Sequence, residues 1–414
     1  MNIIVIGAGA AGLIAAGQAA AEGAQVTLIE KNDRPGRKLM ITGKGRCNIT
    51  NTEQMPDFLK YIPGNGQFLY SSLSRFDNND LINFFNEHGL ETKIERGGRV
   101  FPVSDKAEDV VRTLTEFCLS KGVKFKYSVS VKEIISELGK VTAVRCADGS
   151  EYECDAAIVT TGGASYPGTG STGDGYEIAR RLGHTLIPLK PALVPLETKE
   201  EWVKEMQGLS LKNVEVSVLY KGKKTVSEFG EMIFTHFGVS GPIILTLSRA
   251  IVPQLDKEQG VTIQLDLKPA LTEEQLDARV QRDFTKYARK QFQNSLDELL
   301  PKSMIPVMLK LSGIQTDKPV HQITREERLK LVELMKSFTL TVTRPRSIKE
   351  AIVTAGGVSI KEINPKTMES KLISGLYFAG EVVDVDAYTG GFNLQAAFSM
   401  GYVAGTSAAA SYGR

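Results

Sequence analysis

The stretch that decides the fold stands at the start of the chain: Asn2-Ile3-Ile4-Val5-Ile6-Gly7-Ala8-Gly9-Ala10-Ala11-Gly12. A short β-branched run leads into three glycines with the spacing G-x-G-x-x-G, and a helix-compatible stretch follows from Leu13 to Glu22. Residues 25–30 then predict a second strand that ends in an acidic residue. Because the connection is short and helical, we expect the two strands to be parallel neighbours in one sheet.

The three glycines and the acidic residue form a fingerprint for a dinucleotide. Gly7 allows the tight turn, Gly9 lets a pyrophosphate approach the backbone, and Gly12 lets the helix pack closely on the strand. The amides at the start of the helix favour the phosphate charges. Glu30 is expected to accept hydrogen bonds from the ribose hydroxyls and to repel a 2′-phosphate, which leaves FAD or NAD. The other residues predicted around this turn are Ala10, Ala11 and Lys31.

The composition is that of an ordinary globular protein with a large core. The chain has 414 residues, of which 42% are hydrophobic and 24% charged, so two or three domains are expected. Lys and Arg total 50 against 48 Asp and Glu. This balance implies no strong electrostatic field, so we expect no nucleic-acid partner.

The cysteines and the one long apolar run bear on the compartment. None of the four cysteines is part of a C-x-x-C pair, which argues against a metal site and for a reducing, cytoplasmic setting. The run from Ile3 to Ala21 is long enough for a membrane span, but it is rich in glycine and contains Gln18. A buried strand and helix explain it better, so no membrane partner is expected.

The first part of the chain alternates strands and helices around one long irregular segment. Residues 31–66 are rich in glycine, asparagine and proline and predict a functional loop. Asp148-Gly149 indicates a hairpin turn. The remaining elements predicted here are helices near 80–88 and 106–121 and strands at 124–131, 141–147 and 156–160.

The pattern of buried strands, glycine turns and helices stops after Pro188 and resumes near Gly375. Alternating apolar residues predict strands at 214–220 and 261–267, and residues 272–335 are helical in pattern, with capping boxes at Thr272/Gln275 and Thr324/Glu327. A strand is predicted at 338–343, and an amphipathic helix from Leu394 to Ala410 closes the chain. The predicted domains are a discontinuous one, 1–192 with 353–414, and an insertion, 193–352, that is β-rich at 193–268 and 336–352 and helical at 269–335.

Later motifs narrow the identity of the dinucleotide. Gly380-Glu381, followed by a helix, resembles the second half of the FAD site in glutathione-reductase-type flavoproteins. The chain is identified as a member of the bacterial NAD(P)/FAD-dependent oxidoreductase family that includes bile-acid 3-dehydro-Δ4,6-reductase and aminoacetone oxidase. The matching blocks are Gly36–Asn51, Gly98–Pro102, Thr161–Pro167, Phe234–Pro242, Thr354–Val358, Gly380–Asp386 and Thr389–Gln395. The resemblance implies an α/β fold: a doubly wound, Rossmann-like FAD-binding domain with an inserted mixed β plus helical domain.

The resemblance also implies which residues hold a tight, non-covalent FAD. Val131 matches the position where related flavoproteins clamp adenine through the backbone. Asn393 is predicted to cap the last helix, with amides of Leu394 and Gln395 meeting charge on the flavin and Arg46 or Lys44 as secondary cations. The remaining predicted contacts are Arg37, Lys38, Thr42, Gly43, Gly45, Cys47, Asn48, Thr161, Gly162, Gly163, Gly380 and Glu381.

Catalytic residues are only weakly indicated. His236, Tyr166 and Tyr388 are candidate proton donors, although a histidine among aromatic residues is more often structural. Cys47 is a candidate redox thiol, which would need a lowered pKa and access. Arg99, Arg344 and Arg346 could bind an anionic substrate, although arginines are more commonly solvated surface residues.

These observations favour an FAD-dependent oxidoreductase that reduces an activated C=C or related group of a small organic substrate. We expect the insertion to cover the flavin and to shape the substrate pocket. Only one complete fingerprint is present, so NAD(P)H would bind transiently as the electron donor. The alternatives are an oxidase that acts on a small amine with O2, and a low-turnover FAD-binding redox sensor or RNA-modification accessory. The oligomeric state is not predicted.

Overall fold

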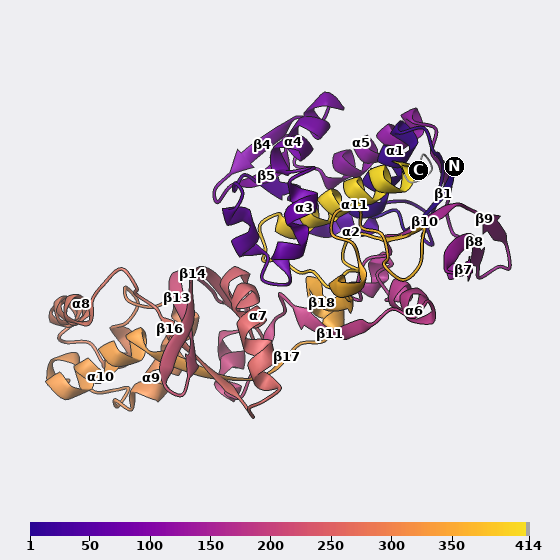
Figure 1. Ribbon diagram of the computed structural model, residues 1–414. Coiled ribbons are helices and arrows are strands. Elements are labelled where there is room, and N and C mark those ends of the chain that lie inside the picture. The colour runs from indigo at the N-terminus through magenta and orange to yellow at the C-terminus, as the bar shows by residue number, and fades with distance from the viewer. Residues whose placement is uncertain (411–414) are drawn as a thin grey trace. The chain divides into compact units, whose positions relative to one another are not determined.

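A computed structural model describes residues 1–410, and the chain divides into two compact units (Figure 1). Unit 1 is formed by Met1–Pro191 together with the C-terminal segment from Ile352, and unit 2 is Ala192–Ala351. Within the described residues, no helix is both long and apolar enough to cross a membrane. The prediction that 193–352 is a separately folding insertion stays a prediction.

The centre of unit 1 is a five-stranded parallel sheet with the order β19-β10-β1-β2-β6. β1 (Asn2–Ile6) pairs on one side with β2 (Gln25–Ile29) and on the other with β10 (Ala156–Val159). β19 (Leu376–Phe378) pairs with β10, so the C-terminal segment belongs to the same sheet as the N-terminus. The predicted doubly wound, Rossmann-like α/β fold is therefore confirmed.

The predicted strand at 124–131 is in fact two elements. β6 (Lys124–Lys126) lies at the edge of the parallel sheet, and β7 (Val131–Glu137) begins a separate antiparallel sheet. Between them Ser128 has a φ of +58°, a left-handed conformation that cannot continue a strand. The predicted hairpin at Asp148-Gly149 is confirmed between β8 (Lys140–Cys146) and β9 (Glu151–Glu153).

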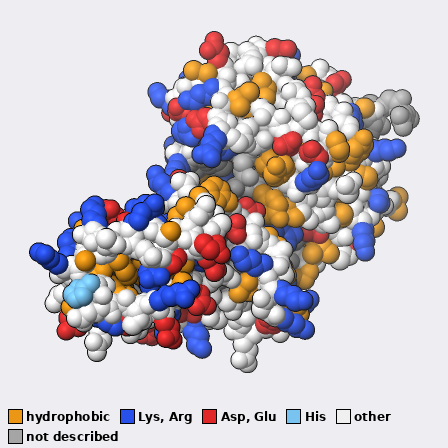
Figure 2. Space-filling model, turned by 90° about the vertical axis from the view of Figure 1, so that its left-hand side faces the viewer, with side chains coloured by type: hydrophobic (Ala, Val, Ile, Leu, Met, Phe, Trp, Pro, Cys, Tyr) orange, Lys and Arg blue, Asp and Glu red, His pale blue; other side chains and the backbone are white. Residues whose placement is uncertain are grey.

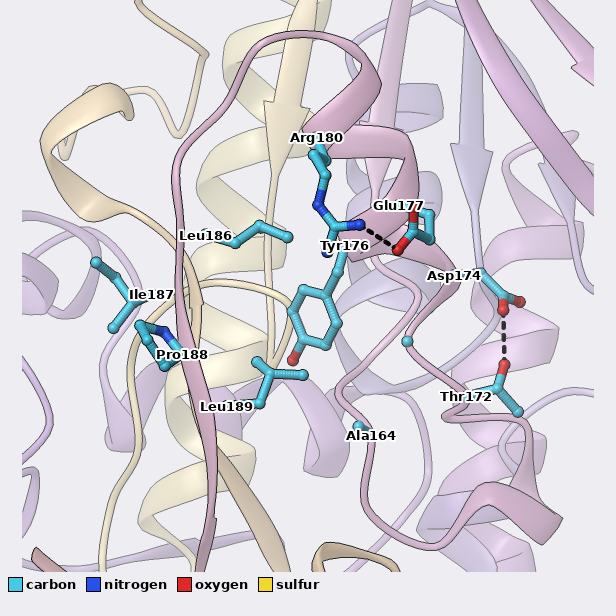
Figure 3. Close-up of a pocket in the computed structure, with 11 residues that line it drawn as sticks. Ala164, Thr172, Asp174, Tyr176, Glu177, Arg180, Leu186, Ile187, Pro188 and Leu189 are labelled. Carbon is cyan, nitrogen blue, oxygen red and sulfur yellow. Dashed lines mark hydrogen bonds and ion pairs between the residues drawn. The ribbon is translucent and has the colours of Figure 1, made fainter. Parts of the chain in front are cut away.

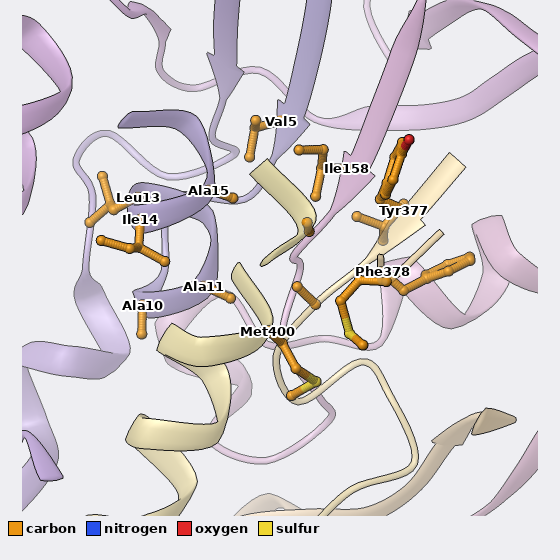
Figure 4. Packing of buried hydrophobic residues seen from close by; sticks show 14 of the residues in the cluster. Val5, Ala10, Ala11, Leu13, Ile14, Ala15, Ile158, Tyr377, Phe378 and Met400 are labelled. Carbon is orange, nitrogen blue, oxygen red and sulfur yellow. The ribbon is translucent and has the colours of Figure 1, made fainter. Parts of the chain in front are cut away.

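The helix α1 (Ala10–Ala21) packs against α5 (Ala107–Ser120) and along α11 (Phe392–Ala410). Figure 4 shows side chains of α1, of the strands and of α11 in one apolar cluster. A Cβ on Gly401 would lie 2.4 Å from the carbonyl oxygen of Ala11, and one on Gly405 would lie 2.3 Å from that of Ala15. The two helices therefore meet backbone to backbone.

The prediction that the last helix is amphipathic is wrong. α11 is buried along most of its length, because α1 covers one side while α3 (Tyr70–Leu73), α4 (Asn78–Glu87) and β3 (Thr50–Asn51) lie against it as well. A helix covered on several sides is apolar all round and carries no polar stripe.

The predicted loop at 31–66 is partly regular. It contains α2 (Arg37–Ile41), β3 and several short 3-10 turns, and β3 joins β5 (Arg99–Pro102) and β4 (Thr92–Glu95) in a small sheet. Sequence analysis also missed α6 (Asp174–Arg181) and the pair formed by β11 (Leu186–Ala192) and β18 (Val353–Val358).

Unit 2 contains a closed six-stranded barrel with the order β12-β15-β14-β13-β16-β17. The helix α7 (Pro242–Leu255), which was not predicted, packs on β14. Three further helices follow, and both predicted capping boxes are confirmed at the starts of α8 and α10. The bounds are β12 Leu196–Thr198, β13 Ser210–Tyr220, β14 Lys223–Phe234, β15 Gly238–Ser240, β16 Val261–Asp266, α8 Glu273–Lys286, α9 Ile305–Ser312, α10 Arg325–Lys336 and β17 Phe338–Pro345.

The backbone contact between α1 and α11 makes a testable prediction at Gly405. Helix propensity alone would favour alanine in a helix interior. Because the added Cβ would meet the backbone of Ala15, which cannot move without its helix, we expect Gly405→Ala to lower the free energy of unfolding by about 1–3 kcal/mol. Thermal denaturation of the purified protein measures this. Gly168→Ala is the control, because a Cβ there meets nothing within 4 Å; equal melting temperatures for the two variants would contradict the prediction.

Candidate functional site

The glycine turn between β1 and α1 is closed on one side and open on the other. Gly7 has a φ of +103°, and a Cβ on Gly12 would lie 1.8 Å from the carbonyl oxygen of Gly7. A Cβ on Gly9, in contrast, would meet nothing within 4 Å. No side chain caps the start of α1. The first amides of this helix are thus free of side-chain competition beside the open space at Gly9, as an anion site requires.

The carboxylate of Glu30 is buried and holds this turn in place. Oε2 accepts a hydrogen bond from the Ala8 amide at 2.7 Å, while Oε1 accepts from the amide of Asn32 at 2.8 Å and from its side-chain Nδ2 at 2.7 Å. A carboxylate offers roughly four acceptor positions. Three of these positions are used within the protein. The carboxylate of Glu30 can therefore accept one further hydrogen bond, which is enough for one ribose hydroxyl.

Lys31, which follows Glu30, is bound to α6. Its ammonium donates to Asp174 at 2.6 Å and to the hydroxyl of Thr172. Its charge is therefore balanced by a carboxylate within unit 1, and its predicted contact with the cofactor stays a prediction.

Lys38 and Glu381 form the polar centre that joins the two ends of the chain. Nζ of Lys38 lies 2.6 Å from Oε2 of Glu381 and 2.7 Å from the Ser165 hydroxyl. Oε1 of Glu381 accepts from the Thr354 amide at 2.8 Å and from Ser165 at 3.0 Å. A Cβ on Gly163 would lie 2.7 Å from this carboxylate, so the glycine is needed for the approach.

Gly380, directly before Glu381, brings the C-terminal segment to the start of α1. It has a φ of +81°, and its Cβ would lie 3.0 Å from that of Ala11. Gly162, with a φ of +75°, lies beside Ser171. The structure thus brings together three predicted parts of the site: the first turn of α1, the segment Thr161–Gly163 and the pair Gly380-Glu381.

The predicted cationic loop is largely paired with carboxylates. Arg46 donates to Glu95 at 2.8 and 3.1 Å and to Asp105 at 3.2 Å, and its guanidinium lies 4.1 Å from the centre of the Phe101 ring. The hydrogen bond from Arg46 holds the pKa of Glu95 below its usual range. Arg37 pairs with Asp33 at 2.8 Å. The sequence prediction treated these cations as available to an anionic ligand; in the structure, Arg37, Lys38 and Arg46 each face a carboxylate.

Lys44 differs from the other cations of this loop. It is exposed and has no side-chain hydrogen bond or ion pair with any residue of 1–410. The backbone around it is left-handed at Gly43, Lys44, Gly45 and Cys47. Thr42 begins this tight turn, with its hydroxyl donating to the Leu39 carbonyl and its own carbonyl accepting from the Cys47 amide.

The structure argues against Cys47 as a redox or nucleophilic residue. Its side chain is fully buried, and burial raises the pKa of the thiol to about 12. At neutral pH the thiolate, which is the reactive form, is therefore almost absent. Cys47 is part of the core beneath the loop.

Three buried polar atoms in the predicted site have no partner within the described residues: Arg37 Nε, Asn48 Oδ1 and Thr161 Oγ1. Burying a polar atom without a hydrogen bond is costly, so such atoms call for an explanation. All three belong to residues that the sequence assigned to the cofactor. Together with the open face of the glycine turn, they show that the residues present fit a bound dinucleotide.

The start of α11 corrects two sequence predictions. The helix begins at Phe392, so Asn393 lies inside it and is not the cap; its side chain instead accepts from the Ala387 amide and donates to the carbonyls of Ala387 and Tyr388. The amide of Gln395 donates to the Gly391 carbonyl at 3.0 Å and is not free for a flavin. The Gln395 side chain is buried and bound to Thr50, Phe76 and Ser399, while the predicted contact of Leu394 stays a prediction.

The candidate catalytic residues are divided between the units. Tyr166, which is 37% exposed, and the half-buried Tyr388 lie in unit 1, whereas His236 is exposed in unit 2 beside Phe237. No proton donor is singled out by this arrangement. Val131, the predicted adenine clamp, begins the edge strand β7 and is half-buried.

The arginines considered for an anionic substrate are all bound to acidic side chains. In unit 2, Arg344 and Arg346 both pair with Glu197, at 2.6 and 2.8 Å. In unit 1, Arg99 lies 3.7 Å from Glu95. The solvated or structural default is thus favoured for each.

Sequence analysis missed a cavity of ≈ 420 Å³ between α6 and β11 in unit 1 (Figure 3). The Tyr176 ring points into it, and the Tyr176 hydroxyl donates to the carbonyl of Glu381 at 3.2 Å. Glu177 and Arg180 pair at its rim. The acidic first turn of α6, which contains Asp174 and Glu177, was the signal that could have revealed this helix.

Comparison with known proteins gives full-length matches. Residues 1–407 match the HI0933-like protein Rossmann domain. The chain is 34% identical over 412 residues to the 3-dehydro-bile acid delta(4,6)-reductase of Clostridium scindens, covering 99% of each chain. It is 35% identical over 404 residues to the ribosomal RNA dihydrouridine synthase of Haemophilus influenzae, covering 96% of each. The 3-ketosteroid delta1-dehydrogenase of Sterolibacterium denitrificans has a similar fold, with a TM-score of 0.56, 14% identity and 99% of each chain covered.

The buried carboxylate at the end of β2 predicts the behaviour of Glu30→Gln. The amide nitrogen of glutamine cannot accept a hydrogen bond, so one contact of the turn and the charge-assisted contact to ribose are both lost. We expect the affinity for FAD to fall by about 1.5–3 kcal/mol. Titration of the apoprotein with FAD measures it, with Glu22→Gln, an exposed position outside the site, as the control. An unchanged dissociation constant would show that Glu30 does not contact the ribose.

Thiol chemistry tests the assignment of Cys47 to the core. The four cysteines are buried, and burial raises the pKa of Cys47, Cys118 and Cys154 to about 12. We expect none of them to react with a thiol reagent in the native protein at pH 8, and all to react after unfolding. The Cys47→Ser variant should still bind FAD, and NAD(P)H should reduce its flavin at an unchanged rate. Rapid labelling of Cys47 in the native protein would contradict this.

Proposed function

Because the chain belongs to the HI0933-like family of Rossmann-domain proteins and is an FAD-dependent oxidoreductase, we propose that it reduces a carbon–carbon double bond conjugated to a carbonyl group. The electrons come from a reduced nicotinamide that binds transiently. The first substrate class is a small organic enone. The four buried free thiols support a reducing, cytoplasmic compartment.

The observation that carries this proposal is the bond change shared by two full-length relatives. One is named for reduction of a 3-dehydro bile acid at delta(4,6), and the other for forming dihydrouridine in ribosomal RNA. In both reactions the reduced double bond is conjugated to a carbonyl group, although the substrates differ greatly in size. The reaction is therefore better supported than either substrate.

The residues of unit 1 divide the work of holding FAD. The turn Gly7–Gly12 and the first amides of α1 receive the pyrophosphate, and Glu30 receives the ribose. Arg37 Nε, Asn48 Oδ1 and Thr161 Oγ1 gain the hydrogen bonds that they lack within the protein. A bound FAD supplies hydride transfer between the nicotinamide and the double bond. Tyr166 and Tyr388 are the candidate proton donors of this unit.

A second substrate class, uridine within RNA, is favoured by the Haemophilus influenzae relative. The near-neutral charge of the whole chain argues against sequence-independent binding over a wide surface. It does not argue against a local docking site, because local charge is set by which side chains are paired.

Anaerobic titration tests the proposed reaction. We expect NADH or NADPH to bleach the flavin absorption of the holoenzyme, and a steroid-like 4-en-3-one or a uridine-containing RNA to restore it. The substrate that restores the absorption should gain two hydrogen atoms across its double bond, and mass spectrometry of the product detects this gain. A saturated 3-ketone is the matched control, since it has no double bond to reduce. A flavin that NADH and NADPH leave oxidised but that a small amine reduces, and that is re-oxidised only when O2 is admitted, would contradict the proposal and favour an amine oxidase.

A further inference from the structure

A cluster of cations lies at the end of α8 in unit 2. Arg282, Lys286, Arg289 and Lys290 are all exposed and fall between residues 282 and 290, and we call them the α8 cationic surface. The one acidic residue of this stretch, Asp283, is buried and bound by Arg279 at 3.0 Å. The acid is thus turned away from the surface that carries the four cations.

Most of these cations lack an acidic partner. Lys286 lies 2.5 Å from Glu298, but Arg282, Arg289 and Lys290 make no ion pair or side-chain hydrogen bond with any residue from 1 to 410. The ammonium of Lys290 stands 4.1 Å from the centre of the Tyr287 ring. This pattern is the opposite of the Arg37–Arg46 loop in unit 1, where carboxylates neutralise three of the four cations.

Three of the four cations, Lys286, Arg289 and Lys290, line a hollow, and hydrogen bonds hold the turn that carries the last two. A cavity of ≈ 250 Å³ is lined by residues 285–290. The neighbouring segment holds this turn, because the Val320 amide donates to the Lys290 carbonyl at 3.0 Å and the His321 amide donates to the Ala288 carbonyl at 3.3 Å. The Tyr287 hydroxyl donates to Glu298 at 2.6 Å, which fixes the ring beneath Lys290. The cations are thus presented from an ordered turn.

We propose that the α8 cationic surface docks the phosphate backbone of an RNA. Guanidinium and ammonium groups without protein partners are the groups that neutralise phosphates, and such contacts position a nucleic acid without reading its sequence. The inference rests on the second substrate class of the proposed function, and it assigns to unit 2 the task of holding the RNA while unit 1 carries FAD.

Other partners fit this surface less well. A membrane surface would be expected to add exposed large apolar side chains, and within 282–290 the structure has none. Figure 2, which looks onto the side that carries α8 and α10, shows Lys and Arg side chains mixed with Asp and Glu and no uniform basic face. A local site for a few phosphates agrees with this distribution better than a wide contact with an acidic protein.

A second group of lysines in unit 2 provides an internal comparison. Lys221, Lys223 and Lys224 lie at the turn of the β13–β14 hairpin and are exposed. Lys224 is 3.8 Å from Glu215, and Lys221 lies over the ring of its neighbour Tyr220 at 5.3 Å. These three lysines equal in number the three cations removed in the test variant below, and none of them lines the cavity at residues 285–290. Their removal therefore separates docking at α8 from general attraction.

The experiment measures binding of the flavin-loaded full chain to a fluorescein-labelled, single-stranded, uridine-containing RNA by fluorescence anisotropy over a series of salt concentrations. The test variant combines Arg282→Ala, Arg289→Ala and Lys290→Ala. We expect its dissociation constant to rise at least about tenfold and the slope of log K against log salt to fall by about 2, since each phosphate on a single strand contributes roughly 0.7. Lys221→Ala/Lys223→Ala/Lys224→Ala and, in unit 1, Lys121→Ala/Lys124→Ala should bind like the unchanged protein.

Flavin absorbance and circular dichroism establish that each variant is folded, and the single variant Arg289→Glu replaces the triple variant if that one is not. No RNA binding by the unchanged protein, or equal weakening by the hairpin variant, would overturn the proposal. Re-oxidation of the reduced flavin by a small enone is measured on the same samples. A triple variant that reduces the enone normally but loses RNA binding supports docking at α8, whereas normal RNA binding by that variant refutes the docking site and leaves the proposed reaction intact.

Discussion

The close approach of α1 to the strand before it is the constraint on which the rest of unit 1 depends. A Cβ on Gly12 would lie 1.8 Å from the carbonyl oxygen of Gly7, so the turn and the helix fit together only without a side chain at that position. Farther along, Gly401 and Gly405 allow α11 to touch the backbone of the same helix. Because packed interiors yield little, the position of the first amides of α1 is set by these contacts rather than by a ligand.

The polar contacts around Lys38 and Glu381 complete this arrangement by joining segments that are distant in sequence. A partly buried ion pair adds little net stability, but removing one partner leaves the other unpaired, which costs more than the pair contributes. Both oxygens of Glu381 are also bonded to Ser165, Thr354 or Lys38. The main effect of these contacts is therefore to hold Glu381 and the preceding Gly380 against the start of α1.

Local signals in the sequence predicted much of this, and contacts between distant segments account for the errors. The strand, glycine turn and helix at residues 2–21 and the capping boxes at Thr272 and Thr324 depend on neighbouring residues, and all were confirmed. The role of Asn393 was wrong, because its partners in the preceding loop and the true start of α11 are set by tertiary packing. The burial of Cys47, and with it the loss of a reactive thiol, likewise depends on a core that no local pattern reveals.

The sequence likewise does not show which charged side chains are paired in the fold. Arg46 and Arg289 are both arginines that lie near lysines in the sequence. Arg46 is nevertheless neutralised by Glu95 and Asp105, whereas Arg289 faces no carboxylate among the described residues. A net charge of +2 averages over both situations. Arg37, Lys38 and Arg46 are already paired, so Lys44 is the one cation of the Arg37–Arg46 loop without a partner among the described residues. We therefore propose that backbone amides of α1 meet most of the charge of a ligand in unit 1. In unit 2, Arg282, Arg289 and Lys290 have no acidic partner among the described residues, so we expect a local attraction for a polyanion there even in a chain that is almost neutral.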